Sequence, residues 1–339
     1  MKIISFNSYK GGSCRTTTCA NTIPFLAKAL HADAKHPIIL VDLDLDSMGL
    51  TSIVDKLTKR DTERTYSSRD LCVDTSKNAQ EHARSIEAVG QGDFRYFDLY
   101  EKVGRQFGLE EEGAILFLGA NPKTGTIGDS DRDRLFANDS PMTKLVNSLL
   151  DLEDDDADDR PAAIVFDCAS GAQMTTLAVL RKIDTAVMCM RPTVQARIGT
   201  SMYLKGPLPR EFRNSINSKQ HRVILLPTAV SEIKEPFDKT NRIEVDSYLT
   251  LKNLRQKAFD EIEAHIIRQI IGNVRINYQL QIDMAENKEE DGVIGIPEID
   301  RFKWEEGLLF EVLGGQEMTC QEKKLNQQYE KLANLIARD

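Results

Sequence analysis

The sequence predicts a doubly wound α/β protein, with a mostly parallel sheet of about seven strands flanked by helices. Short apolar runs recur along the chain, and each run ends in turn-forming or polar residues. The runs are almost continuously apolar, which is typical of strands covered on both faces rather than strands with one wet face. Helical patterns lie between them. Such alternation is typical of a doubly wound sheet, whose ligands bind at the carboxyl ends of the strands.

The expected strands and helices follow one another along the whole chain. The strand-like runs are IISFN (3–7), PIILVDLDL (37–45), GAILFLGA (113–120), AAIVFDCA (162–169), TAVMCMRP (185–192), RVILLPTAV (222–230) and GVIGIPEI (292–299). The helix-like runs cover residues 16–31, 140–152, 175–183, 250–271 and 321–337. We expect residues 1–339 to form a single domain. Two insertions, at about 56–112 and 232–291, interrupt the alternation with stretches rich in charge and turn formers.

Composition and charge narrow the class of protein. With 339 residues, 41% of them apolar, the chain can bury a large core. The net charge of -9 argues against a surface that binds nucleic acid over its whole extent. The six cysteines form no CxxC pair and no signal-peptide pattern precedes the first strand, which predicts a cytoplasmic protein. No apolar run approaches the roughly 20 residues needed to span a bilayer.

Residues 7–21, NSYKGGSCRTTTCAN, have the parts of a phosphate site between the first strand and the first helix. Such a site needs inward-facing backbone N–H groups, a side-chain cation and a hydroxyl for magnesium. Gly11 and Gly12 allow a tight turn close to an anion, and the helix that begins near Arg15 directs its N-terminal N–H groups to the same place. We expect Thr16 to supply the magnesium hydroxyl and Thr17 to supply a further phosphate contact.

This stretch resembles the deviant Walker A motif KGGxx(K/R)(S/T)T of the ParA/MinD family of P-loop ATPases, and it is most similar to the arginine-containing branch. The resemblance implies a ParA/MinD-like P-loop fold that binds ATP and Mg²⁺. It implies that Lys10 reaches across a nucleotide-sandwich homodimer to the phosphates of the partner. The nucleotide-binding residues that it implies in this loop are Lys10, Gly11, Gly12, Ser13, Cys14, Arg15, Thr16 and Thr17.

A second segment, DLDLDSMGL, follows the strand at 37–45 and resembles the DxD segment of the same family. On this resemblance Asp44 positions or activates the attacking water, and Asp42 supports the magnesium ion and its shell. Asp46 stands where the family has a glutamate. A lone carboxylate at a strand end is common in α/β proteins, so the segment gains its weight from the glycine loop that precedes it.

Two later segments continue the resemblance in the same order. AAIVFDCASG resembles the Walker B strand and switch, which implies that Asp167 binds the magnesium shell and that the backbone N–H of Gly171 faces the γ-phosphate. GVIGIPEID resembles the last strand of the family, whose loop, with Pro297, lines the base pocket. A preference for adenine over guanine is implied by the family alone.

Three departures from the family pattern bear on the chemistry. Arg15 replaces the lysine that contacts the β- and γ-phosphates, and its planar fork is not equivalent to an ammonium, although it still binds phosphate bidentately. Cys14 replaces a glycine, at a cost of about 1 kcal/mol if the backbone needs positive φ. Pro24 is expected to kink the first helix.

The leading hypothesis is an ATP-dependent switch that dimerises on nucleotide and slowly hydrolyses ATP to control an unidentified partner protein. Its catalytic residues would be Lys10, Arg15 and Asp44, and its metal ligands Thr16, Asp42 and Asp167. Such proteins position cargo, partition DNA or regulate an effector. A nucleotide-binding scaffold without turnover stays open as the alternative, as does a metabolic relative of the same superfamily.

Two surface features suggest partners of other kinds. The stretch 205–222 contains five Lys and Arg residues that could contact DNA, but it has no aromatic interleaving, so a solvated surface is the favoured interpretation. The C-terminal helix has one apolar stripe, and its polar face is not dominated by cations. We therefore expect the stripe to dock on the sheet rather than on a membrane. Its residues are Leu325, Tyr329, Leu332, Leu335 and Ile336.

Overall fold

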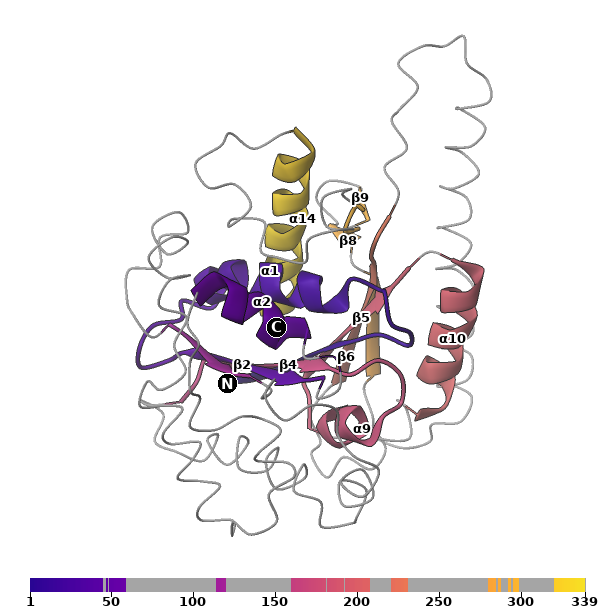
Figure 1. Cartoon of the computed structure of the whole chain (residues 1–339), viewed down its shortest axis with the longest axis horizontal. Coiled ribbons are helices and arrows are strands. Elements are labelled where there is room, and N and C mark those ends of the chain that lie inside the picture. The colour runs from indigo at the N-terminus through magenta and orange to yellow at the C-terminus, as the bar shows by residue number, and fades with distance from the viewer. Residues whose placement is uncertain are drawn as a thin grey trace.

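The structure is a computed structural model of the whole chain (Figure 1). It describes residues 1–44, 47, 49–58, 114–119, 160–180, 182–191, 193–207, 221–230, 280–284, 286–287, 292–293, 295–298 and 320–338. The predicted helices at 140–152 and 250–271 lie outside these residues, as do Asp46 and most of both predicted insertions.

A seven-stranded sheet forms the centre of the molecule, in the order β3-β2-β4-β1-β5-β6-β7. All six neighbouring pairs are parallel, which confirms the predicted doubly wound sheet. The strands are β1 (Lys2–Asn7), β2 (Ile38–Leu43), β3 (Ile115–Leu118), β4 (Ala163–Cys168), β5 (Thr185–Met190), β6 (His221–Pro227) and β7 (Leu280–Met284). Every residue of β2, β4 and β5 is buried, as expected for strands covered on both faces.

The position of the last strand differs from the prediction. The seventh strand is β7, within the stretch predicted as an insertion, and not the run at 292–299. In that run, Gly292–Val293 forms β9, which pairs antiparallel with β8 (Glu286–Asn287), and Pro297 forms only an isolated bridge with Val230. The physical reason is that proline has no N–H to donate to a ladder and glycine weakens a strand interior, whereas β7 contains neither residue.

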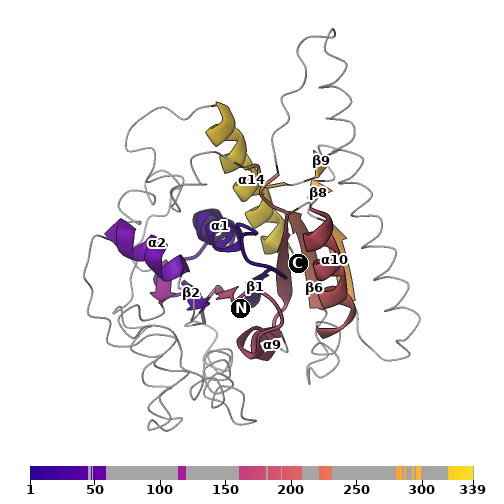
Figure 2. The same cartoon turned by 45° about the vertical axis from the view of Figure 1, so that its right-hand side comes forward.

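Helices cover both faces of the sheet (Figures 1 and 2). On one side lie α1 (Arg15–Ala29), α2 (Gly49–Thr58) and α14 (Cys320–Ala337). On the other side lie α9 (Met174–Leu180) and α10 (Val194–Lys205). The helix α1 continues through Pro24 as one element of 15 residues. This arrangement leaves the carboxyl ends of the strands, where the predicted site residues lie, at one edge of the sheet.

The C-terminal helix packs on the body of the protein, as predicted, but its main contact is α1 rather than the sheet. The stripe residues of α14 are buried, and they belong to the same apolar core cluster as Ile23 and Leu26 of α1 and residues of the central strands. Within the parts of the chain that the structure describes, no helix combines the length and apolar character needed to cross a membrane.

Candidate functional site

The ends of three adjacent strands bring the predicted site residues together. In the order β2, β4, β1, the register pairs Asp42 with Asp167 and Asp167 with Phe6. The loop after β1 therefore starts beside the carboxylate at the end of β4, which in turn lies beside the carboxylates at the end of β2. This is the edge of a doubly wound sheet at which ligands bind.

The loop between β1 and α1 has a strained and tightly turned backbone. Gly12 has φ 73° and Cys14, which caps α1, has φ 50°, so two of three consecutive residues adopt left-handed conformations. The Ser13 hydroxyl donates to the Lys10 carbonyl at 2.6 Å and closes the turn. Cys14 therefore has the positive φ for which a cysteine is less favourable than a glycine. A residue with a Cβ in this conformation costs about 1–2 kcal/mol. Strain of this kind persists where surrounding contacts hold it.

The N-terminus of α1 is suited to binding an anion. Cys14 makes no side-chain capping hydrogen bond, and the first turn of α1 holds no acidic residue. The first N–H groups of a helix lack partners within the helix and carry the positive end of its dipole. A Cβ added to Gly11 would meet no atom of the described residues within 4 Å, so these residues leave the space beside the loop open there. Thr17 is buried, and Thr16 is partly exposed.

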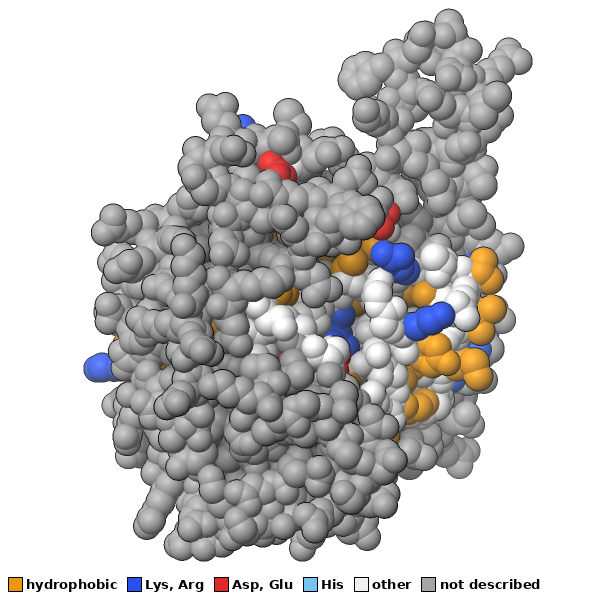
Figure 3. Space-filling view, in the orientation of Figure 1, with side chains coloured by type: hydrophobic (Ala, Val, Ile, Leu, Met, Phe, Trp, Pro, Cys, Tyr) orange, Lys and Arg blue, Asp and Glu red, His pale blue; other side chains and the backbone are white. Residues whose placement is uncertain are grey.

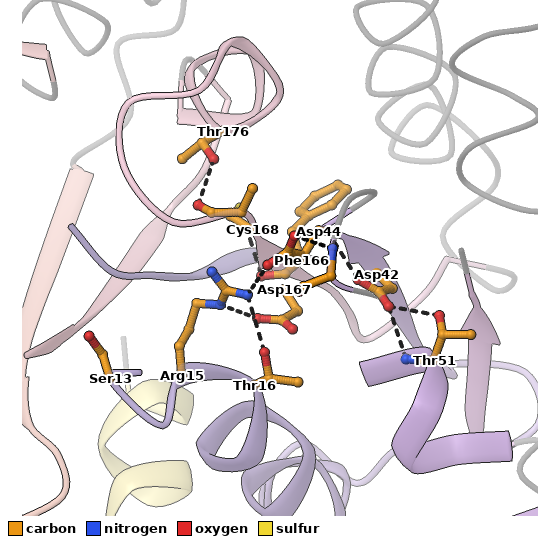
Figure 4. A network of polar contacts seen from close by, with 12 residues as sticks. Ser13, Arg15, Thr16, Asp42, Asp44, Thr51, Phe166, Asp167, Cys168 and Thr176 are labelled. Carbon is orange, nitrogen blue, oxygen red and sulfur yellow. Dashed lines mark hydrogen bonds and ion pairs between the residues drawn. The ribbon is translucent and has the colours of Figure 1, made fainter. Parts of the chain in front are cut away.

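Arg15 is the centre of the polar network at this edge (Figure 4). Its Nε donates to Asp167 Oδ1 at 2.7 Å, and its Nη2 donates to Asp44 Oδ2 at 2.8 Å. The same Nη2 lies 3.1 Å from the Thr16 hydroxyl oxygen, to which it donates. The Arg15 side chain is only 7% exposed, so it forms a buried ion pair with two carboxylates at once. The planar fork of arginine is suited to bridging two acceptors in this way.

The ion pairs set the charge states of the three side chains. Burial lowers the pKa of Arg15, but the attraction of Asp167 and Asp44 outweighs it and raises the pKa further above its usual range. For Asp44, burial raises the pKa, but the charge and hydrogen bond of Arg15 outweigh it, so the pKa is lowered. For Asp167, burial dominates and raises the pKa, although Arg15 opposes it. Arg15 is thus a permanent cation and Asp44 its ionised partner.

Asp42 has a different set of partners from Asp44. Its Oδ2 accepts from the backbone N–H of Thr51 at 2.9 Å and from the Thr51 hydroxyl at 2.7 Å. Its Oδ1 accepts from the backbone N–H of Asp44 at 3.1 Å. The fully buried carboxylate therefore fixes the backbone of Asp44 and the first turn of α2. Burial, with the nearby Asp167, raises the pKa of Asp42 to about 7.

Lys10 and Tyr9 connect the loop to α10. The Lys10 ammonium donates to Gln195 Oε1 at 2.8 Å on the protein surface. The ring of Tyr9 lies over Gly199, where an added Cβ would come within 1.9 Å of a ring carbon. Gly199 thus provides the space in which the ring packs. Both contacts couple the loop after β1 to the position of α10.

The remaining predicted site residues, Gly171 and Pro297, lie at the same edge of the sheet. Gly171 has φ 80°, and its N–H donates to the Ser8 carbonyl at 2.7 Å, so the switch segment after β4 is bonded to the start of the loop. Contact of this N–H with a phosphate would require that bond to open. The segment containing Pro297 lies beside the end of β6, where Ile296 donates to the Pro227 carbonyl.

Comparisons with known proteins identify the fold. No protein-family model matches the chain, and no curated protein matches it by sequence. Solved structures do match over nearly the whole chain. A McdA–ATP complex from Cyanothece has a TM-score of 0.54 at 11% identity, covering 98% of this chain and 96% of that chain. A ParA family ATPase from Chlorobium tepidum has a TM-score of 0.52 at 13% identity, covering 98% of each chain.

A third solved structure is a MinD protein, whereas the ParA family ATPase above represents the ParA side of the predicted family. It is the septum site-determining protein MinD from Pyrococcus horikoshii with Mg-ADP, with a TM-score of 0.50 at 15% identity, covering 98% of this chain and 94% of that chain. The chain has the ParA/MinD fold. At these identities the likeness concerns the fold, and the roles of individual residues must be argued from the geometry of this chain.

Within the ParA/MinD fold, the donors for Mg²⁺ are of the right type. Mg²⁺ prefers oxygen ligands and usually binds through one or two carboxylates, with waters and substrate phosphates completing the shell. Asp167 Oδ2 is buried and has no hydrogen-bond partner in the described part of the chain. No three His, Cys, Asp or Glu side chains among the described residues could hold a metal by themselves. These residues therefore fit a metal that arrives with phosphate oxygens, rather than one held in a cage of protein side chains alone.

Several residues of this candidate site were not singled out by the sequence. Thr51 holds Asp42 from nine positions further along the chain, and Gln195 receives Lys10. Gly49 lies against Thr16, because a Cβ added there would come within 3.3 Å of Thr16 Cγ2. For Thr51, the only sequence feature that could have indicated a contact with Asp42 is its position in the first turn of a helix. Nothing in the local sequence marks Gln195 or Gly199.

Replacing Asp42 by asparagine should change how stability depends on pH. The raised pKa means that the wild-type protein gains stability from protonated Asp42 below about pH 4 and loses it as the pH rises through 7. Asparagine has no such titration, and its NH₂ group cannot accept from the Asp44 N–H. Relative to wild type, Asp42→Asn should therefore be least stable near pH 5 and recover by up to about 1.4 kcal/mol per pH unit toward pH 7. Urea unfolding at pH 5–8 measures this, and a constant difference would contradict it.

Proposed function

We propose that this chain is a member of the ParA/MinD family that binds ATP with Mg²⁺, dimerises on nucleotide and slowly hydrolyses ATP to control a partner protein. The observation that carries the proposal is the convergence of the loop after β1 with Asp44 and Asp167 at one sheet edge, joined by Arg15. Neighbours with the same fold are bound to ATP and to Mg-ADP, which supports the choice of ligand.

Each side chain then has a distinct task. The loop around Gly11 and Gly12 and the N-terminus of α1 bind the phosphates, with Arg15 as the side-chain cation. Thr16 and Asp167 would hold Mg²⁺, and Asp42 supports them through the backbone of Asp44. Bound Mg²⁺ neutralises charge on the phosphate oxygens. Asp44 orients the attacking water, because its carboxylate is fixed at the end of β2 and faces the start of α1.

Lys10 is the residue proposed to act across the dimer. Its ammonium lies on the surface and donates to Gln195, so it can leave its position without exposing core residues. A cation in this position can neutralise phosphate charge in a second protomer. Lys10→Ala should therefore abolish ATP-dependent dimerisation and leave the fold unchanged.

Light scattering after gel filtration, with ATP and Mg²⁺, tests this directly. Wild type is expected to double its mass with nucleotide, whereas Lys10→Ala stays a monomer. Lys35→Ala is the matched control, because Lys35 is an exposed lysine that precedes β2 and so lies at the opposite edge of the sheet. Dimers of Lys10→Ala with ATP, or the absence of heat when wild type is titrated with ATP, would contradict the proposal.

A nucleotide-binding scaffold without turnover is the second candidate. It is favoured by the contact of Arg15 with Asp44, which engages the water-positioning carboxylate at 2.8 Å. Phosphate release distinguishes the two functions. A slow ATPase should lose about 100-fold or more in rate in Asp44→Asn, the range for one side chain that assists proton transfer. Equal release by wild type and Asp44→Asn would support the scaffold.

The surface favours a protein partner over DNA. Val194, Ile198 and Met202 are each more than half exposed, and their spacing of four places them on one face of α10 (Figure 3). This face belongs to the helix that contacts Tyr9 and Lys10 of the loop. Of the basic stretch 205–222, Arg222 donates to the Leu335 carbonyl near the end of α14, so it serves an internal contact.

A further inference from the structure

Arg15 contacts one side-chain oxygen of each of the three residues that the proposed function assigns to a metal and to the attacking water. Its guanidinium nitrogens are 2.7 Å from Asp167 Oδ1, 2.8 Å from Asp44 Oδ2 and 3.1 Å from Thr16 Oγ1. These three oxygens come from β4, the end of β2 and α1 (Figure 4). One positive group thus holds together three elements that a divalent cation would otherwise have to bridge.

The carboxylates at this edge need a cation whether or not nucleotide is bound. Asp44 and Asp167 are both buried, and ionised carboxylates are costly to bury without a counter-charge. Lys10 does not supply it, because its ammonium is bonded to Gln195 on the surface. Arg15 does supply it, at hydrogen-bond distance to both carboxylates and with almost no exposure to solvent.

We propose that Arg15 is the built-in cation of the nucleotide-free protein, which holds Asp44, Asp167 and Thr16 in place of a divalent metal and blocks metal binding until Arg15 leaves them. This inference rests on the proposed function for the identity of the metal. The contact is exclusive for two reasons. The Arg15 fork cannot bind phosphate bidentately while it spans two carboxylates. A divalent cation on the same oxygens would lie beside the guanidinium charge and be repelled by it.

The charge of Arg15 therefore sets the order in which nucleotide and metal bind. Nucleotide phosphates attract the guanidinium away from the carboxylates. Only then can a divalent cation approach Thr16 and Asp167, including the Asp167 Oδ2 that Arg15 does not contact, without repulsion from the guanidinium charge. Arg15 changes partners from carboxylate to phosphate, so the buried acids exchange one cation for another and are not left unpaired. Metal binding in this protein is thereby coupled to nucleotide binding.

Titration of nucleotide-free protein with Mn²⁺, followed by electron paramagnetic resonance, tests the inference. Wild type is expected to show no saturable site that Mg²⁺ can compete for. Arg15→Gln removes the charge and is expected to bind Mn²⁺ at least about tenfold more tightly than wild type, since two buried carboxylates then lack a cation. Arg15→Lys keeps the charge and should stay within about threefold of wild type.

Two outcomes would overturn the inference. The first is a saturable Mn²⁺ site in nucleotide-free wild type that is lost in Asp167→Asn, and it requires no substitution of Arg15. The second is a folded Arg15→Gln variant, verified by circular dichroism, that binds Mn²⁺ no better than wild type. If Arg15→Gln does not fold, the wild-type arm decides. Neither measurement contains nucleotide. A failure of this inference can therefore be distinguished from a failure of the protein to bind ATP, which would contradict the proposed function.

Discussion

At pH 8 in metal-free buffer, replacing Arg15 by methionine should lower the free energy of unfolding by about 3–5 kcal/mol, the usual cost of removing one partner of a buried ion pair. Methionine fills a similar volume but leaves the buried carboxylates of Asp44 and Asp167 without the cation that now lies within 2.8 Å of both. A loss of this size is a large share of the 5–15 kcal/mol that holds a typical domain folded.

The sign of the pH dependence separates this charge effect from a packing defect. In wild type the pKa of Asp44 is lowered by Arg15, so its contribution to stability is complete above about pH 4 and is lost only at lower pH. In Arg15→Met, both carboxylates take up protons more readily when folded. The deficit should therefore shrink as the pH falls from 8 to 5.5.

Urea unfolding of wild type, Arg15→Met and Arg15→Lys at pH 8 and 5.5 measures both effects. Arg15→Lys keeps a cation but loses the fork, so its deficit should be smaller than that of Arg15→Met at pH 8 and should depend less on pH. A deficit of Arg15→Met that is equal at the two pH values would mean that packing, and not charge, is what Arg15 contributes.

The sheet illustrates what sequence pattern can and cannot predict. Six strands lie within the predicted runs or extend one residue beyond them, because strands buried on both faces are marked by continuous apolar residues. The seventh was placed wrongly, since GVIGIPEI is more apolar than LQIDM. Apolar character alone does not decide strand formation there, because Gly295 and Pro297 interrupt the backbone ladder.

For the candidate site, the sequence located the edge of the sheet but not the contacts. The glycine loop and the carboxylates after β2 and β4 were predicted from their positions after apolar runs, and the register does bring them together. The partners of Arg15 were not predictable, because a long side chain at the start of α1 can point to a phosphate or to the carboxylates with the same local sequence. The Tyr9–Gly199 contact likewise joins residues that are distant in sequence.

Replacing Leu332 by alanine should lower the free energy of unfolding by about 2–5 kcal/mol, the range for a fully buried leucine whose site only partly collapses. Leu332 is 0% exposed, and it lies on the face of α14 that also carries Tyr329 and Ile336. This face joins the core cluster with residues of α1, so truncation leaves a cavity between two helices. Because α1 begins at Arg15, the cost falls on the element that follows the glycine loop after β1.

Gln327→Ala is the matched control, since Gln327 is an exposed residue of the same helix and surface substitutions usually cost within about 0.5 kcal/mol. Chemical denaturation of both variants gives the comparison. Similar small losses for Leu332→Ala and Gln327→Ala would mean that the apolar stripe of α14 is not packed against α1 in solution. The stripe would then be free for another surface, such as a membrane or a partner helix. A large loss confined to Leu332→Ala would establish that the same stripe is committed to the core. The proposed control of a partner would then use another face of the protein, such as that of α10.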